Sequence, residues 1–475
     1  MKIIFILLLI AGMSSCSKLV EVNPPSTSLT GSNVYSSDAT AIAVVTGIYA
    51  QLGNQGDIAS GLKSISLFCG LSADELTLYS GVTSFSYIDY YRNSLSVALS
   101  TGSDVWAGAY PLIYLCNSVI SGVGASNNLT PAVKTELLGE ALFLRAFFYF
   151  YLTNLYGDVP LVLSTNYKQN AQMSRTPQAQ VYQQIITDLT NAQNLLSSNY
   201  LDGTLLATSP ERLRPNKWAA TALLARVYLY MQKWSDAESQ ADLIINDSSM
   251  FRLSKIDMAF LRAGLGNSEA IWQLQSAVSA VVTNTFDAFI FVIPSSGLNS
   301  VSHPVYLSQG LVQSFDTADL RRTHWVDSVV VKGIVYYFPY KYKVSAIKTP
   351  VSEYSMVMRL GEIYLIRAEA RAQQGNIAGA QADLDAIRAR AGVSNTNVND
   401  QISLLAVIAH ERRLELFTEW GHRWLDLKRT QAVDSIMSVA TPNKGGTWNP
   451  DWELFPLPLT DLQSDNKLTQ NPGYN

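Results

Sequence analysis

Residues 355–392 read SMVMRLGEIYLIRAEARAQQGNIAGAQADLDAIRARAG. This stretch predicts two antiparallel helices joined by a tight turn. Apolar and small residues recur at helical spacing through both halves, beginning with Leu360 and Tyr364. Gly375 stands where the end of a helix favours a positive φ angle, and Asn376 can cap the helix that follows. The small side chains between these points let the two backbones approach closely.

The same pattern occurs earlier in the chain. Asn216 to Met231 and Ser235 to Ile245 predict a second helix pair, with aromatic and small residues in its first half. Residues 139–157, GEALFLRAFFYFYLTNLYG, are apolar on almost every side and predict a long buried helix that ends at Gly157. Each pair resembles a tetratricopeptide-like (TPR-like) unit, which is a helix–turn–helix of roughly 34 residues. We therefore expect a mostly α-helical fold in which TPR-like helix pairs stack into a short solenoid.

Residues 247–351 differ from the rest of the chain. They contain strand-like runs such as AIWQLQ and SVVVKGIVYYFPYKY, separated by proline, glycine, serine and asparagine. We expect an insertion of loops and short strands mounted on the helical scaffold. Loops on a rigid frame commonly carry recognition, so this insertion is the expected variable binding region.

Three glutamates follow the helix pair at four-residue spacing, within residues 406–429, AVIAHERRLELFTEWGHRWLDLKR. The spacing predicts one continuous helix with three carboxylates on one stripe, and like charges at that spacing repel. Cations must therefore compensate them, either from this segment (Arg412, Arg413, Arg423) or from the helix pair (Arg359, Arg367, Arg388, Arg390). We predict a structural ion-pair network made of Glu411, Arg412, Glu415, Glu419, Arg423 and Asp426. The alternative is an acid–base site, but no isolated carboxylate with apolar neighbours stands out as a tuned acid.

The composition excludes several classes of function. The chain has 475 residues, of which 48% are hydrophobic and 15% charged, with a net charge of −4. These values predict a folded protein and give no sign of nucleic-acid binding. The chain also contains 9 Trp, 24 Tyr and 16 Phe, so some aromatic rings are available for a binding surface after the core is filled.

The N-terminus predicts a targeting segment. Residues 1–15 contain Lys2 and a short apolar run that is too short to span a bilayer. Residues 13–16, MSSC, resemble a bacterial lipoprotein cleavage box, so Cys16 is the expected lipidation site and residues 16–36 the tether. We expect no transmembrane helix elsewhere. The alternative is an ordinary secretory signal in which Cys16 is incidental.

The sequence contains no motif typical of a metal, phosphate, dinucleotide or hydrolase site. The four histidines show no metal-ligand spacing, and no phosphate-binding loop, dinucleotide motif or hydrolase elbow occurs. We therefore expect no metal and no cofactor. Asp74 and Glu75 are adjacent, and we expect them to cap or hydrogen-bond locally rather than to form a catalytic pair. Cys69 and Cys116 could form one disulfide in an exported protein, although two buried free thiols are the favoured interpretation.

Several stretches in the same order along the chain resemble the SusD/RagB family of Bacteroidetes outer-membrane nutrient-binding lipoproteins. They are CSKLVEVNPPS after the cleavage box, GEALFLRAFFYFYLTNLYGDVPLV, RLGEIYLIRAEA, ERRLELFTEWGHRWLDLKR, FPLPLTD and NKLTQNPGYN. The resemblance implies a single SusD-like domain over residues 37–475. It also implies a lipid-anchored lid, facing the cell exterior, over a SusC-type TonB-dependent outer-membrane transporter. Such a lid binds an oligosaccharide without cleaving it, whereas the RagB branch handles peptides.

A sugar presents apolar C–H faces and polar edges, so its site requires exposed aromatic rings beside polar side chains. We expect residues 79–93 to form a surface loop that supplies such rings, and the insertion to supply others. The candidate ligand-binding residues are Tyr79, Tyr87, Tyr90, Tyr91, Arg92, Asn93, Trp106, Tyr306 and Trp325. For each ring the alternative is core or loop packing, and for Trp106 the helical phase favours that alternative.

These observations give three functional hypotheses. The first is a non-catalytic surface protein that captures oligosaccharides for the transporter. The second is a RagB-like protein that captures oligopeptides, which a shortage of surface aromatic rings would favour. The third is a surface hydrolase that uses the glutamates near Glu415.

Overall fold

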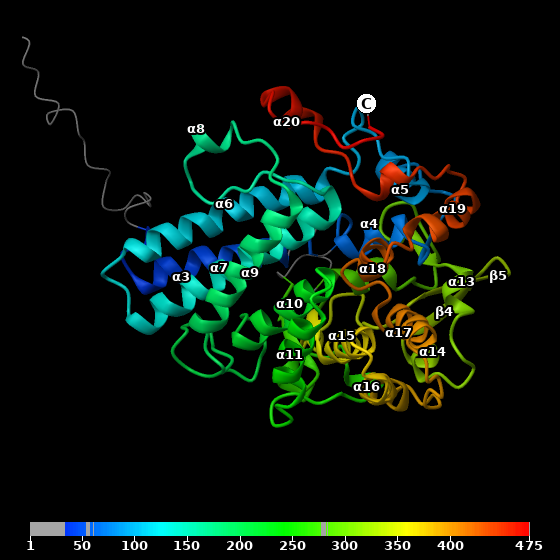
Figure 1. Cartoon of the computed structure of the whole chain (residues 1–475). Helices are drawn as coiled ribbons and strands as arrows, with labels where there is room; N and C mark the ends of the chain where they lie inside the picture. Colours follow the sequence, from blue (N-terminus) through cyan, green and yellow to red (C-terminus); the bar gives the residue numbers. More distant parts are fainter. Residues whose placement is uncertain (1–33, 54–57, 60, 277–281, 283, 475) are drawn as a thin grey trace, which may run out of the picture.

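The computed structural model of the protein describes residues 34–53, 58–59, 61–276, 282 and 284–474. The expected signal segment (residues 1–15), the expected lipidation site Cys16 and the expected tether as far as residue 33 lie outside these residues. In the described part, most of the chain is helical, and six short strands form three two-stranded sheets (Figure 1). The expected mostly α-helical fold with a few short strands is confirmed.

A continuous stack of helices forms the scaffold, and each helix of the stack packs against the next (Figure 1). The stack consists of α6 (Asp104–Ala125), α7 (Pro131–Tyr156), α9 (Gln178–Leu195), α10 (Lys217–Tyr230), α11 (Trp234–Ile245), α15 (Leu360–Gln373) and α16 (Ile377–Arg390). α11 packs directly on α15, although the whole insertion lies between them in the sequence. The two helix pairs predicted from the sequence, α10–α11 and α15–α16, are therefore neighbours in the stack.

The long helix α7 forms the centre of the scaffold. It begins at Pro131 and ends at Tyr156, and Gly157 follows with a φ of 73°. Its rings are buried on all sides between α6 and α9, as the apolar pattern predicts. Burying a Phe side chain stabilises a fold by about 1.5–3 kcal/mol, so this helix contributes strongly to the core. α3 (Asp38–Leu52) also packs on α6 and α7.

A pair of antiparallel strands connects the insertion to the start of α15. β2 (Ala270–Leu274) pairs with β6 (Ser355–Arg359), which places Leu274 opposite Ser355 and Ala270 opposite Arg359. The expected helix start at Ser355 is therefore wrong, because these five residues pair with β2 before α15 begins at Leu360. A local helical pattern cannot reveal a pairing partner that lies about eighty residues away.

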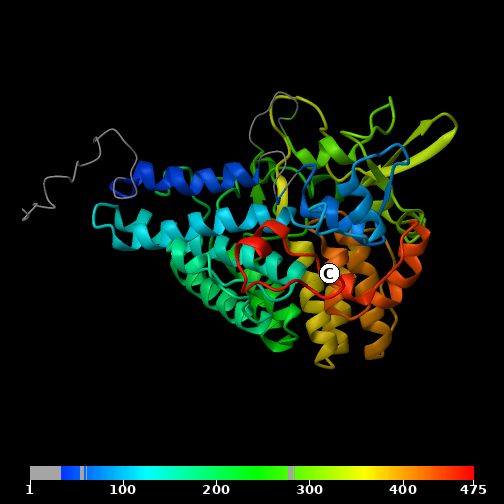
Figure 2. The ribbon, with the colours of Figure 1, turned by 90° about the horizontal axis from the view of Figure 1, so that it is seen from above.

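The remaining elements pack around this scaffold, and the hairpin of β4 and β5 projects from the body (Figure 2). The strands are β1 (Leu76–Leu78), β3 (Val305–Leu307), β4 (Val326–Val331) and β5 (Ile334–Pro339). The helices are α4 (Ile65–Ser72), α5 (Phe85–Arg92), α8 (Tyr167–Asn170), α12 (Phe286–Phe291), α13 (Gln309–Val312), α14 (Leu320–His324), α17 (Gln401–Leu416), α18 (His422–Arg429), α19 (Val433–Asn443) and α20 (Leu459–Ser464). Residues 79–93 were expected to form a surface loop, and the structure instead places most of them on α5.

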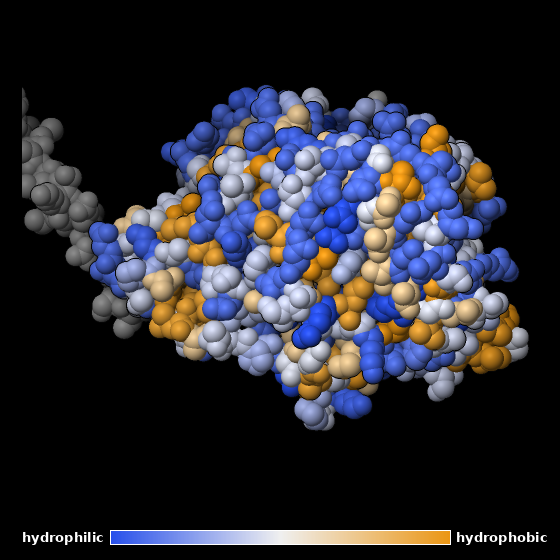
Figure 3. Space-filling view, turned by 60° about the horizontal axis from the view of Figure 1, so that its bottom comes forward, coloured by the Kyte–Doolittle hydropathy of each residue, from blue (hydrophilic) through white to orange (hydrophobic). Residues whose placement is uncertain are grey.

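Cys69 on α4 and Cys116 on α6 are both buried free thiols. No helix among the described residues combines the length and apolar character that crossing a membrane requires. The face of the molecule shown in Figure 3 is mostly hydrophilic, with hydrophobic residues in scattered groups.

Candidate functional site

Four tyrosines from separate stretches of the chain gather around the sheet of β1 and β3. The pairing places Thr77 opposite Tyr306, and the backbone N–H of Tyr79 donates to the carbonyl of Pro304 at 2.8 Å. Because side chains alternate along a strand, Thr77, Tyr79 and Tyr306 lie on the same face. Tyr336 on β5 contacts Tyr306, with ring centroids 5.1 Å apart and planes at 83°. We call Tyr79, Tyr91, Tyr306 and Tyr336 the aromatic patch.

Tyr91 reaches this patch from α5. Its hydroxyl lies close to the side chain of Thr77 and near Tyr306. Burial raises the pKa of both Tyr91 and Tyr306, so their hydroxyls stay neutral and can both donate and accept hydrogen bonds. All four rings are half-buried, which holds them firmly while leaving part of each accessible. Such rings can stack on the apolar face of a polar ligand.

Two basic side chains, Arg92 and Lys444, lie beside Tyr91 of the aromatic patch, and burial lowers the pKa of Lys444 to about 7. Arg92 is exposed at the last residue of α5. The ammonium group of Lys444 lies 5.4 Å from the ring centroid of Tyr91. On the opposite face of β5, away from Tyr336, the guanidinium of Arg322 lies 4.7 Å from the ring centroid of Tyr337. Of the sequence-derived candidates, the structure thus brings together Tyr79, Tyr91 and Tyr306, with Arg92 on the same helix as Tyr91.

Three other candidates from this segment are buried. Tyr90 is 0% exposed and stacks on Phe68, with ring centroids 4.0 Å apart. Tyr87 donates to the carbonyl of Leu62 at 3.1 Å. Asn93 ends α5 in the left-handed conformation and donates to the carbonyl of Ser72 at 3.0 Å. In this structure these side chains pack the core, because α5 turns them toward α4, and they have no surface to offer a ligand.

The two tryptophan candidates do not lie in the aromatic patch. Trp325 is 1% exposed and donates its indole N–H to the carbonyl of Ile256 at 3.0 Å. The guanidinium groups of Arg359 and Arg390 each lie 5.6 Å from its ring centroid. Trp106 is 3% exposed on α6 and donates its indole N–H to Asp461 at 2.9 Å. Core packing is therefore the role of Trp325, and Trp106 lies beside a different groove, on α6.

The three glutamates of the predicted stripe each form buried ion pairs. Glu415 is 0% exposed and contacts Arg321, Arg359 and Arg390. Burial acts to raise the pKa of Glu415, but these arginines lower it well below its usual range. The other two glutamates are paired in the same way, Glu411 with Arg321 and Arg388, and Glu419 with Lys341 and Arg359.

The partners of these glutamates differ from the local arginines proposed from the sequence. Arg412 pairs with Asp426 at 2.9 Å, and Arg413 and Arg423 both pair with Asp74. Arg367 pairs with Asp242 and Asp383 instead. The prediction of one continuous helix through the three glutamates is also wrong, because α17 ends at Leu416 and Glu419 lies in the turn before α18. Arg321 and Lys341 come from the insertion, and residue spacing within 406–429 cannot indicate partners that lie so far away in the sequence.

Asp74 and Glu75 do not form a catalytic pair. The carboxylate of Asp74 accepts from Arg423 at 2.7 Å, and one carboxylate oxygen of Glu75 accepts from the backbone N–H of Thr418 at 3.2 Å. Burial raises the pKa of Glu75 to about 7. Among the described residues, no group of three or more His, Cys, Asp or Glu side chains is arranged to hold a metal ion.

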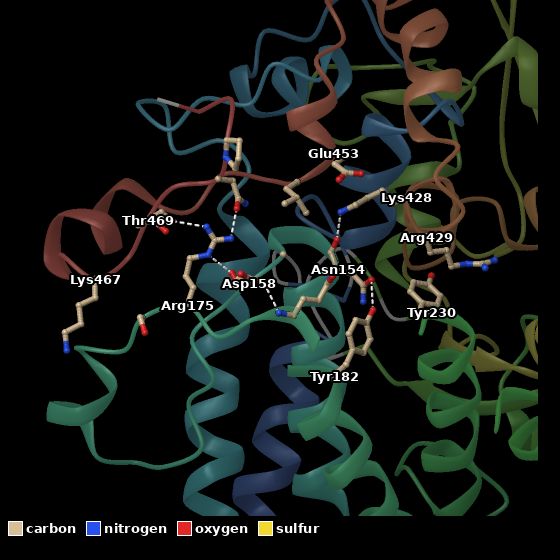
Figure 4. Close-up of a pocket in the computed structure, with 16 residues that line it drawn as sticks. Asn154, Asp158, Arg175, Tyr182, Tyr230, Lys428, Arg429, Glu453, Lys467 and Thr469 are labelled. Carbon is tan, nitrogen blue, oxygen red and sulfur yellow. Dashed lines mark hydrogen bonds between the residues drawn. The ribbon is translucent and has the colours of Figure 1, made fainter. Parts of the chain in front are cut away.

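A polar cavity of about 680 Å³ lies where α7 meets the C-terminal segment (Figure 4). On one side Arg175 donates to the carbonyls of Asp158 and Thr469 at 2.7 and 2.9 Å. On the other side Lys428 donates to the carbonyl of Asn154, and burial lowers the pKa of Lys428 to about 8. Because these cations bond to the protein's own carbonyls, the cavity wall holds the C-terminal segment onto the end of α7.

Two family models match the chain. The model described as "Starch-binding associating with outer membrane" matches residues 71–229, and the model described as "SusD family" matches residues 328–474. SusD-like protein P2 of Formosa agariphila is 27% identical, and the match covers 100% of this chain and 99% of that protein. The chain belongs to the SusD/RagB family.

Solved structures show the same fold. A SusD superfamily protein from Bacteroides vulgatus has a TM-score of 0.79 at 18% identity, covering 92% of this chain and 99% of that one. A laminarin-binding SusD-like protein has a TM-score of 0.76 at 23% identity, again covering 92% of this chain and 99% of the other. The matches span the helical scaffold and the insertion together.

Proteins of the SusD family are non-catalytic binding proteins associated with the outer membrane, and this chain is one of them. The hydrolase hypothesis is therefore wrong. The structure gives the physical reason: Glu415 is shielded from solvent by three arginines and is held ionised, so it has neither access to a substrate nor a proton to donate.

Sequence reasoning did not select Tyr336 as a site residue. The run SVVVKGIVYYFPYKY indicates a hairpin around Lys332 and Gly333, and alternation along β5 could have separated outward from inward rings. What the run cannot show is that β5 packs on β3, which brings Tyr336 to Tyr306. Tyr114 on α6 and Tyr167 on α8 were not selected either, and both rings are exposed.

Proposed function

We propose that this SusD-family protein is a lipid-anchored surface protein that captures oligosaccharides at the aromatic patch. It delivers them to a SusC-type TonB-dependent outer-membrane transporter. The observation that supports this proposal is the meeting of Tyr79, Tyr91, Tyr306 and Tyr336 on one sheet face. A structural relative of this chain is described as laminarin-binding, which is consistent with a glycan ligand.

The chemistry of the aromatic patch suits a sugar better than a charged or extended apolar ligand. Ring faces pack against sugar C–H groups, while the neutral hydroxyls of Tyr91 and Tyr306 can exchange hydrogen bonds with sugar hydroxyls. The Tyr306–Tyr336 contact and the half-buried position of Tyr91 hold the rings in place in advance. Pre-organised rings lose little side-chain freedom on binding, which favours affinity.

Affinity electrophoresis in native gels tests the proposal. The lipid-free protein should be retarded by at least one neutral polysaccharide from a panel of laminarin, starch, xylan and mannan. The double variant Tyr306→Ala/Tyr336→Ala should require roughly tenfold more polysaccharide for the same retardation, since each aromatic contact contributes about 0.5–1.5 kcal/mol. Tyr228→Ala, which removes a half-buried ring from α10 on the scaffold, is the matched control and should be retarded like the wild type.

The opposite results are equally clear. Retardation of the wild type by none of the polysaccharides, with heat released on titrating oligopeptides, would replace the proposal by the RagB-like alternative. A folded double variant that is retarded like the wild type would remove the aromatic patch from the binding role. Circular dichroism of each variant shows whether it is folded.

The anchor and the transporter are tested separately. Mass spectrometry of the protein from native membranes should find Cys16 as the acylated first residue, and Cys16→Ser should release the protein from the membrane. An affinity-tagged chain, co-produced with a SusC-type transporter from the same genome, should co-purify with it. An unmodified Cys16 in the native protein would contradict the anchor, and failure to co-purify would contradict the partner.

A further inference from the structure

A second groove lies far from the aromatic patch, between α6, α8 and α20. α8 and α20 lie on the same side of α6 (Figure 1). The groove has a volume of about 360 Å³, which is within the range of small-molecule sites. Its walls include Tyr110 and Tyr114 from α6, Tyr167 from α8, and Asp461 and Asp465 from the α20 region.

Exposed aromatic rings concentrate at this groove. Among the described residues, three aromatic side chains are strongly exposed: Phe85 at 68%, Tyr114 at 47% and Tyr167 at 71%. Two of these three line the same groove. Leaving large rings in water is unfavourable, and their clustering in one hollow is typical of a binding surface.

The floor of the groove is rigid. Trp106 donates its indole N–H to Asp461 at 2.9 Å, which joins α6 to α20 across the groove. The ring of Trp106 lies 4.8 Å from that of Tyr110, and the hydroxyl of Tyr110 donates to the carbonyl of Pro160 at 3.0 Å. These contacts fix the floor before any ligand arrives, so binding requires little ordering of the protein.

The charges of the groove select the ligand. Asp461 and Asp465 line it, and the described lining residues include no lysine, arginine or histidine. Asp465 accepts one hydrogen bond, from the backbone N–H of Lys467 at 3.0 Å, which leaves further lone pairs on its carboxylate free to accept sugar hydroxyls. Two carboxylates without a compensating cation in the lining repel acidic ligands.

We propose that this groove is a second glycan-binding site that is selective for neutral oligosaccharides. This proposal rests on the proposed function. Tyr114 and Tyr167 stack on sugar rings, and Asp461 and Asp465 accept hydrogen bonds from sugar hydroxyls. Two sites on one chain bind a long polysaccharide more tightly than either alone, because the second contact becomes intramolecular.

The test uses the same native gels. In a gel that retards the wild type, Tyr114→Ala/Tyr167→Ala should need roughly 3- to 10-fold more polysaccharide for equal retardation. Combining it with Tyr306→Ala/Tyr336→Ala should abolish retardation, whereas each double variant alone retains part of it. Tyr114→Phe/Tyr167→Phe keeps both rings and should behave like the wild type. Both tyrosines are exposed, so their replacement should leave the circular dichroism spectrum unchanged.

Three results would overturn the proposal. If the groove variant is retarded like the wild type, the groove does not bind glycan, while the proposed function stands. If the groove variant loses retardation in an alginate gel, the groove takes acidic glycans and the neutral assignment is wrong. If no polysaccharide retards the wild type, the proposed function fails, and the second site with it.

Discussion

Glu415 has no exposed surface, and its two carboxylate oxygens contact three arginines from three different parts of the chain. Removing one partner of a buried ion pair leaves an uncompensated charge and costs about 3–5 kcal/mol. We therefore expect Glu415→Gln to lower the free energy of unfolding by about this amount, measured by urea denaturation. Glu238→Gln removes a more exposed carboxylate, paired with Arg371, and should change stability by about 1 kcal/mol or less. Equal effects of the two substitutions would show that the cluster is not structural.

Asp287 on α12 is the opposite case, a buried carboxylate with an unpaired oxygen. No hydrogen-bond partner for its Oδ1 exists among the described residues. Burial, with the nearby Glu419, raises its pKa from 3.8 to about 7. Between about pH 4 and pH 7 the folded state therefore binds a proton that the unfolded chain has lost, so stability falls as the pH rises through this window.

Replacing Asp287 should remove this pH dependence. We expect Asp287→Asn to raise the free energy of unfolding by about 1–3 kcal/mol at about pH 8, where the wild type carries a buried charge without compensation. Below about pH 4 both side chains are neutral, and the difference should vanish. Urea denaturation across this range measures it, with the exposed Asp316→Asn as control. A constant difference at every pH would contradict the raised pKa.

At this scale the sequence predicts residue types better than their orientation. It shows a group of tyrosines in residues 79–93, but Tyr90 and Tyr91 are neighbours with opposite environments. Tyr90 stacks on Phe68, while Tyr91 faces Thr77 and Tyr306. Which ring faces outward is decided by the packing of α5 on α4 and β1, and these contacts cannot be read from spacing within α5 alone.

At the scale of an element, two glycines of α6, Gly122 and Gly124, have opposite surroundings and can be compared. A Cβ on Gly122 would lie 2.1 Å from the ring of Tyr35, whereas a Cβ on Gly124 would meet nothing within 4 Å. Tyr35 is buried, and its hydroxyl hydrogen-bonds to Ser118 at 2.9 Å, so α6 holds the start of the described chain.

The two glycines should respond oppositely to alanine. Gly122→Ala displaces the ring of Tyr35 and should destabilise the fold by about 1–3 kcal/mol. Gly124→Ala meets no neighbour and should be neutral or stabilise by up to about 1 kcal/mol, because alanine is the better helix former. Differential scanning calorimetry should show a lower Tm for Gly122→Ala and an unchanged or higher Tm for Gly124→Ala. A rise in Tm for Gly122→Ala would mean that the packing of the Tyr35 ring does not require a glycine at this position.

Helices and sheets also differ in how well the sequence predicts them. α7 ends at Tyr156 with Gly157 directly after it, as the sequence pattern predicts. The strand β6 was assigned to a helix, because its partner β2 lies far away in the sequence. The same limit applies to the aromatic patch, which exists only because β1 pairs with β3 and β3 packs on β5.

At the scale of the whole molecule, the insertion and the scaffold share their buried charges. Arg321 and Lys341 belong to the insertion, and they contact Glu411, Glu415 and Glu419 next to the helix stack. Releasing the insertion alone would leave these carboxylates buried with fewer cations, which is strongly unfavourable. The β2–β6 pairing adds a second connection at the base of the insertion.

Chains of this length commonly unfold in stages, domain by domain. The shared ion cluster instead predicts that the insertion and the scaffold unfold as one cooperative unit. In hydrogen exchange at increasing urea, peptides covering α14 and α15 should therefore lose protection at the same urea concentration. The turn at Lys332 and Gly333 is exposed and serves as the internal control, since it should exchange quickly without urea. Earlier exchange of α14 than of α15 would mean that the ion cluster does not couple the insertion to the helices.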